Sequence, residues 1–147
     1  MRVAGIDLGT VRVGLAMSDE LGLLAHVRPC LDGRNQDRLV VRLCELAREE
    51  GIDRFVVGLP VTLAGREGPA ARRARQFARQ LAAEGGIAVE LWDERWSTKE
   101  AQARLRDQGL SSRDTRGRID SAAAAIILQA WLDTKRSAVI PKPEPDE

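Results

Sequence analysis

Near its start the sequence reads Val3-Ala4-Gly5-Ile6-Asp7-Leu8-Gly9-Thr10, a short apolar run with one carboxylate near its end. In an extended chain the Asp7 side chain points to the face opposite its two apolar neighbours. A second apolar run, 11–17, follows at once, and the small residues between the runs predict a hairpin turn. We therefore expect Asp7 near the end of a central strand. Since an unpaired buried carboxylate is costly, Asp7 either has a function there or caps its own turn through an Asx hydrogen bond.

The composition is that of an ordinary globular protein. The 147 residues fit one domain, 44% of them are apolar, and the formal net charge is only +1. The charges are unevenly distributed, because residues 66–118 contain 12 Arg or Lys against 8 Asp or Glu. A basic segment of this kind is either solvated surface, the simpler interpretation, or a nucleic-acid contact.

The rare residue types exclude several kinds of site. Cys30 and Cys44 are far apart in the sequence and match neither a metal motif nor a disulfide framework. His26 is the only histidine, which argues against a histidine triad or a histidine-rich metal site. The N-terminus has no signal-peptide pattern, and no apolar run approaches the ~20 residues of a membrane span. We therefore expect a soluble, cytoplasmic protein that does not bind a membrane.

The hydrophobic pattern predicts an α/β domain. Its short connections predict three antiparallel strands, at 2–8, 11–18 and 22–31. Helical spacing and continuous apolar runs predict the later elements: helices from the turn at 33–37 to Gly51, at 70–84, at 97–108 and from 119 onward, strands at 55–59 and 87–92, and a basic loop at 110–118. We expect one domain over 1–135 and a disordered, proline-rich tail over 136–147.

Acidic residues stand at the ends of three predicted elements. Asp7 ends the first strand, Asp93-Glu94 ends the fifth, and Asp120 opens the last helix. In an open α/β sheet, ligands bind beyond the carboxyl ends of the strands, where these acids would meet. Converging carboxylates need a cation, and oxygen ligands without histidine suit Mg²⁺ or Mn²⁺. Each acid also has a simpler interpretation, as a turn residue or as a partner of a helix dipole, and spacing alone does not decide.

Four motifs in succession resemble the YqgF/RuvX family of Holliday junction resolvase-like nucleases, within the ribonuclease-H-like superfamily. They are Gly5–Thr10 with Arg12–Ala16, Val57–Pro60, Asp93-Glu94-Arg95 with Ser97-Thr98, and Ile119–Ala124. The likeness covers residues 1–135, and Trp96 departs from it where an aliphatic residue is expected. The resemblance implies a ribonuclease-H-like α/β fold, with a five-stranded mixed sheet whose first three strands are antiparallel and whose two faces carry helices.

The resemblance also implies a chemistry. The metal-binding acids of the family map onto Asp7, Glu94 and Asp120, whereas Asp93 would point to the other side of its strand. The implied activity is that of a metal-dependent endonuclease, which hydrolyses phosphodiester bonds with two Mg²⁺ or Mn²⁺ ions bridged by Asp7. Several nearby residues are candidates to hold nucleic-acid phosphates: Thr10, Arg12, Arg66, Arg95, Lys99, Arg116 and Arg118. Arg95 has a second interpretation, as a structural partner of Asp93.

The substrate and even the class of protein have alternatives. The family is described both as maturing the 5′ end of pre-16S ribosomal RNA, which we favour, and as cleaving four-way DNA junctions. Junction cleavage would call for a two-fold homodimer, because two symmetric strands must be cut. The sequence Asp-x-Gly-Thr also occurs in the phosphate loop of actin-like kinases, but 147 residues are too few for their two domains. A further hypothesis is a non-catalytic nucleic-acid-binding module in which the acids are structural.

Overall fold

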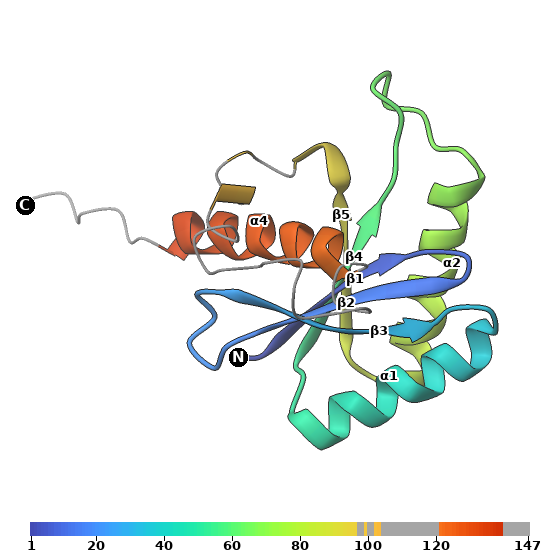
Figure 1. The fold of residues 1–147 in the computed structure, drawn as a ribbon, viewed down its shortest axis with the longest axis horizontal. Coiled ribbons are helices and arrows are strands. Elements are labelled where there is room, and N and C mark those ends of the chain that lie inside the picture. The colour runs from blue at the N-terminus through green and yellow to red at the C-terminus, as the bar shows by residue number, and fades with distance from the viewer. Residues whose placement is uncertain (97–98, 100–101, 104–120, 140–147) are drawn as a thin grey trace, which may run out of the picture.

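A five-stranded mixed sheet forms the centre of the protein (Figure 1), described here by a computed structural model that covers residues 1–96, 99, 102–103 and 121–139. The strand order is β3-β2-β1-β4-β5. The strands are β1 (Val3–Leu8), β2 (Arg12–Ser18), β3 (Ala25–Asp32), β4 (Arg54–Leu59) and β5 (Ala88–Asp93). The first three are antiparallel, whereas β4 and β5 run parallel to β1, so the predicted mixed sheet is confirmed.

Helices cover both faces of this sheet. On one face lie α1 (Gln36–Glu50) and α2 (Pro69–Gly85), and on the other lies α4 (Ala122–Val139), as Figure 1 shows. A single turn of 3-10 helix, η1 (Glu94–Trp96), follows β5 directly. The limits of α1 follow from its caps. Asn35 accepts a hydrogen bond from the backbone N–H of Arg38, and Gly51 ends the helix in the left-handed conformation at φ 68°.

Alternation along β1 divides the core into two layers. Ala4 and Ile6 are buried against α1 and α2, whereas Val3 is buried against α4. Gly5 faces α4 as well, because a Cβ atom there would lie 2.7 Å from the Cβ of Leu128. Asp7, two residues further on, shares that face. The fold therefore brings the Asp7 carboxylate to the α4 side of the sheet, at the carboxyl end of its central strand.

The turn between β2 and β3 is longer than the sequence pattern predicts. The third strand begins at Ala25 rather than at residue 22, because Gly22 has a φ of +69° and belongs to the turn. The carboxylate of Asp19 closes this turn by accepting hydrogen bonds from the backbone N–H groups of Leu23 and Leu24. This turn lies at the end of the sheet opposite the end that holds Asp7.

The C-terminal part of the chain differs from its prediction in one respect. Helix α4 continues to Val139, past the expected boundary at 135, since no proline occurs before Pro141. Of the predicted helix at 97–108, the structure describes Lys99, Gln102 and Ala103, which are helical. The basic loop at 110–118, together with Arg116, Arg118 and Asp120, lies outside the described residues. No helix in the described part of the chain has the length and apolar character to cross a membrane.

Candidate active site

Close contact between β1 and α4 positions Asp7. A side chain at Gly5 would meet the carbonyl oxygen of Ala124 at 2.9 Å, so only glycine lets the start of α4 approach the strand this closely. The next residue on that face, Asp7, is partly buried beside the helix. Removal from water raises the pKa of the Asp7 carboxyl. No described residue donates a hydrogen bond to this carboxylate, so the predicted alternative of a turn cap is not observed.

Glu94 comes from the edge strand β5, at the same carboxyl end of the parallel strands as Asp7. It is the first residue after β5, and it lies over Gly58 of β4, where a Cβ atom would come within 3.3 Å of the Glu94 Cγ and Cδ atoms. A larger residue at position 58 would therefore displace the carboxylate. Burial raises the pKa of Glu94, and the negative charges of Asp7 and Asp93 raise it further. Glu94 therefore lies near enough to Asp7 for the charge of Asp7 to act on it.

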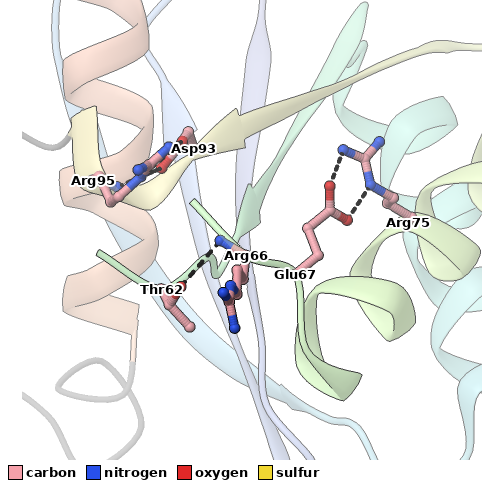
Figure 2. Close-up of polar contacts among 6 residues, drawn as sticks. All are labelled: Thr62, Arg66, Glu67, Arg75, Asp93 and Arg95. Atoms are coloured by element: carbon pink, nitrogen blue, oxygen red, sulfur yellow. Dashed lines mark hydrogen bonds and ion pairs between the residues drawn. The ribbon is translucent and has the colours of Figure 1, made fainter. Parts of the chain in front are cut away.

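Asp93, one residue earlier, is in the opposite situation. Its side chain is 9% exposed and accepts hydrogen bonds from Arg95, at 3.0 Å from Nε to Oδ1 and 2.6 Å from the terminal nitrogen to Oδ2 (Figure 2). The backbone N–H of Arg95 donates to the same carboxylate at 2.9 Å. These hydrogen bonds hold the pKa of Asp93 below its ordinary value. Asp93 is therefore a structural acid, and the interpretation of Arg95 as its partner is observed.

Asp7 and Glu94 are a fitting pair of ligands for a divalent cation. Within the described residues neither carboxylate has a cationic partner, although each is partly buried and Glu94 lies in the field of Asp7. Two such carboxylates favour the binding of a cation that neutralises both. The described part of the chain contains no group of three or more acids, histidines or cysteines that could hold a metal by itself. The predicted third ligand, Asp120, lies outside that part.

A buried hydroxyl fixes the entry to α4, next to position 120. Ser121 is fully buried, and its Oγ accepts a hydrogen bond of 2.9 Å from the backbone N–H of Leu15. This N–H is available because the pairing of β2 with β3 shifts register between Val13 and Leu15. The irregularity in the sheet therefore anchors the first described residue of the C-terminal segment on β2, beside the strand that carries Asp7.

The predicted phosphate contacts are distributed over separate elements. Thr10 and Arg12 are exposed on the hairpin that follows Asp7, and Lys99 is exposed beyond η1. A contact that the sequence analysis missed comes from α2, where Arg73 donates a hydrogen bond of 3.4 Å to the carbonyl oxygen of Leu8. The distance in sequence to Leu8 gave no sign that the two meet.

Residues 61–67 form a small ordered hairpin beside Arg95. Val61 bridges to Glu67, and the backbone N–H and side-chain hydroxyl of Thr62 each bond to the backbone of Arg66 at 3.0 Å. Glu67 ties the hairpin to α2 through two bonds to Arg75, at 2.5 and 2.7 Å (Figure 2). The exposed Arg66 is thus presented from a well-connected turn. A Cβ atom at Gly65 would lie 3.7 Å from an Arg95 nitrogen, so the hairpin and η1 adjoin.

Two solved structures of proteins that act on Holliday junctions share this architecture. RuvC of T. thermophilus in complex with a Holliday junction substrate superposes with a TM-score of 0.67 at 18% identity, over 95% of this chain and 97% of that one. The Holliday junction resolvase of fowlpox virus gives a TM-score of 0.57 at 14% identity, over 91% and 99%. At such identities the likeness concerns the fold alone, and it confirms the predicted ribonuclease-H-like architecture.

Sequence comparison gives much closer relatives. Proteins described as "Putative pre-16S rRNA nuclease" are 48% identical in Anaeromyxobacter dehalogenans and 43% identical in Geobacillus kaustophilus, each over 92% of this chain and at least 98% of the relative. The relative in Symbiobacterium thermophilum is 42% identical over 92% of this chain and 94% of its own length. The family described as "RuvX: Holliday junction resolvase" matches residues 1–134. The chain therefore belongs to the RuvX family.

Proposed function

We propose that this protein is a divalent-metal-dependent endonuclease that matures the 5′ end of pre-16S ribosomal RNA. The observation that supports this most directly is that Glu94, just after β5, lies in the electrostatic field of Asp7 of β1; both carboxylates are partly buried and have no described cationic partner. The names of the relatives in A. dehalogenans and G. kaustophilus support the choice of RNA as the substrate. Membership in a resolvase-like family supports hydrolysis of a phosphodiester bond.

In this proposal Asp7, Glu94 and Asp120 hold two Mg²⁺ or Mn²⁺ ions. When bound, the ions supply an activated water and stabilise the leaving oxygen. The protein residues place the carboxylates. Gly5 and Gly58 admit α4 and the Glu94 side chain close to the sheet, and the Asp93–Arg95 pair fixes the turn on which Glu94 lies. The chain provides no covalent nucleophile in this scheme.

The flanking phosphates are assigned to residues around these acids. Thr10 and Arg12 lie directly past Asp7, and Arg66 with Arg95 lies on the side of Glu94. Three hydrogen bonds to Asp93, from Nε and one terminal nitrogen, occupy one edge of the Arg95 guanidinium, and its remaining N–H groups suit a phosphate oxygen. Lys99, Arg116 and Arg118 complete the set proposed from the sequence.

The remaining assignments follow from the choice of substrate. A role in ribosomal RNA maturation implies that the protein acts in the cytoplasm. We assign the nuclease activity to the domain predicted over 1–135. Cleavage of four-way DNA junctions is the second candidate, favoured by the description of the family itself. That activity would require a homodimer with two symmetric sites. Two measurements therefore distinguish RNA maturation from junction cleavage: which substrate is cut, and whether the protein is a monomer or a dimer in solution.

The decisive experiment compares two labelled substrates, a precursor 16S RNA 5′ end and a four-way DNA junction. Each is incubated with Mg²⁺ or Mn²⁺ and with the native protein, Asp7→Asn or Glu94→Gln. Glu20→Gln is the matched control, since Glu20 is an exposed acid of the β2–β3 turn, at the end of the sheet opposite Asp7. We expect metal-dependent cutting of the RNA that both site variants abolish and the control retains. Metal-independent binding without cleavage would instead establish the non-catalytic binding module.

A further inference from the structure

A groove lined by arginines runs along the outer edge of the sheet, where β3 meets α1. Its volume is about 410 Å³. It is lined by Leu31, Asp32, Arg34, Asn35, Arg38, Leu39 and Arg42. The apolar floor comes from the partly buried Leu31 and the buried Leu39, and the charged walls come from the β3–α1 connection and the first turns of α1. None of these residues was assigned a role by the sequence analysis or takes part in the site described above.

The charges of the groove are mainly positive. Arg34 forms a two-pronged pair with Asp32, at 3.0 Å from Nε and 2.7 Å from a terminal nitrogen, which lowers the pKa of Asp32 to about 2. Arg42 has looser ion pairs with Glu45 and Glu49, at 3.3 and 3.6 Å. Arg38 has no ion pair among the described residues. Three guanidinium groups therefore face one carboxylate within the groove itself.

The spacing of these arginines suits a linear polyanion. Arg38 and Arg42 are four residues apart on α1, so they occupy the same face of the helix about 6 Å apart along its axis. Arg34 precedes the helix by two positions and extends the row toward the end of β3. Guanidinium groups recognise phosphate oxygens through paired N–H donors, and a row of them follows a backbone rather than a single anion.

The groove is joined to the candidate active site by the β1–β2 hairpin. The backbone N–H of Gly33 donates to the carbonyl oxygen of Val11 at 2.8 Å. Arg12 of β2 lies opposite Asp32 of β3 in the strand register. A Cβ atom at Gly33 would come within 3.0 Å of the Gly9 carbonyl oxygen, so the two turns are in direct contact. In Figure 1 the tip of this hairpin, the end of β3 and the start of α1 lie together on one side of the molecule.

We propose that the groove of Arg34, Arg38 and Arg42 binds the phosphodiester backbone of the substrate on one side of the bond that is cut. The path runs from Asp7 over Thr10 and Arg12 of the hairpin to α1. This inference rests on the proposed function for the identity of the ligand as a nucleic acid. It adds a second contact surface, remote from the acids, that holds the substrate without touching the reacting phosphate.

The test measures binding separately from cleavage. Arg38→Gln and the double variant Arg38→Gln/Arg42→Gln are made in Asp7→Asn protein, so that bound RNA stays intact. Arg48→Gln is the matched control, because Arg48 is an exposed arginine in the last turn of the same helix, about 15 Å from Arg38 along the axis. Fluorescence anisotropy with a labelled precursor 16S RNA gives the affinity as a function of salt concentration. Circular dichroism verifies that each variant is folded.

We expect the double variant to bind the RNA about tenfold more weakly, and its salt slope to fall by roughly 1.4–1.8 for two lost phosphate contacts. Arg48→Gln should match the parent protein. In otherwise native protein, Arg38→Gln/Arg42→Gln should raise KM for the long RNA and leave kcat unchanged, and a short RNA confined to the cleavage point should be unaffected. Unchanged affinity and slope in the double variant would overturn the groove assignment.

The two proposals fail in different ways. If the arginine variants keep the affinity and the salt slope of the parent protein while cleavage still depends on Asp7, the groove assignment fails and the nuclease proposal stands. If cleavage is independent of Asp7 while the double variant still lowers the affinity and the salt slope, the proposed catalytic site fails and the groove stands as a nucleic-acid contact.

Discussion

Asp93 and Glu94 are adjacent in the chain and have opposite chemical environments. Asp93 lies at the end of β5, accepts four hydrogen bonds of 2.6–3.0 Å from Arg95, and has a lowered pKa. Glu94 points to the α4 face, has no described cationic partner, and has a pKa that burial and Asp7 raise. The difference teaches that the partners of a carboxylate, rather than its place in a motif, separate a structural acid from a candidate metal ligand.

Substitution of Asp7 should cause the largest loss of cleavage activity. Asp7→Asn keeps the size of the side chain and removes the charge that would hold both ions, so we expect cleavage of precursor RNA to fall on the order of 10³-fold. Initial rates under saturating Mn²⁺ measure this loss. Glu20→Gln, which changes an exposed acid in the β2–β3 turn, should retain full activity. Comparable rates for Asp7→Asn and the control would remove Asp7 from the site.

Substitutions of the adjacent acids Glu94 and Asp93 should affect different properties, activity for Glu94 and stability for Asp93. Glu94→Gln should lower kcat by about 10²-fold or more and leave the fold intact, because this carboxylate has no described structural partner. Asp93→Asn should instead lower the free energy of unfolding by about 1 kcal/mol, through weakened bonds to Arg95, and change kcat only a few-fold. Urea unfolding and cleavage rates measured on both variants test the contrast. An exchange of the two phenotypes would assign the metal to Asp93.

Filling the space beside Glu94 with a larger residue at position 58 should have a smaller effect on activity and stability. Gly58→Ala places a Cβ atom 2.6 Å from the Ile127 Cδ1 atom and 3.3 Å from the Glu94 Cδ atom. We expect about 1–3 kcal/mol of destabilisation from overpacking and a fall in activity on the order of tenfold as Glu94 moves. Gly68→Ala is the matched control, since open space surrounds that position. Full activity in Gly58→Ala would mean that Glu94 tolerates displacement.

The smallest predicted effect concerns pH and stability without metal. The pKa values of Asp7 and Glu94 are raised in the folded state from ordinary values of 3.8 and 4.5, so protonation favours folding and stability is lost as pH rises through the raised values. Asp7→Asn should therefore unfold at a slightly higher temperature than native protein at pH 7, and the difference should vanish below pH 3.8.

Added Mg²⁺ should reverse this order at pH 7, because it stabilises only the protein that binds it. Thermal unfolding followed by circular dichroism gives the unfolding temperatures of native protein and Asp7→Asn, each with EDTA and with Mg²⁺. A native protein that is more stable than Asp7→Asn in EDTA would show that the carboxylate has a stabilising partner.

Much of the fold could be predicted because it depends on local patterns. Alternation around Asp7, the continuous apolar run of β4 and the helical spacing of α1 gave the strands, the helices and the antiparallel start of the sheet. The boundaries that differ are those set by a backbone conformation, as at Gly22, or by the absence of a helix breaker, as at the end of α4. The family was also recognisable, because its motifs are short and contiguous.

By itself the sequence determined the order of elements, the family and the acids worth considering. Only the tertiary structure decided which acids meet, because the approach of Glu94 to Asp7 depends on β4 lying between their strands and on Gly58 leaving room. It also decided that Arg95 bonds to Asp93, that Arg73 reaches the Leu8 carbonyl, and that Arg34, Arg38 and Arg42 line one groove. Contacts between residues distant in sequence depend on packing and register, which no local pattern of residues encodes.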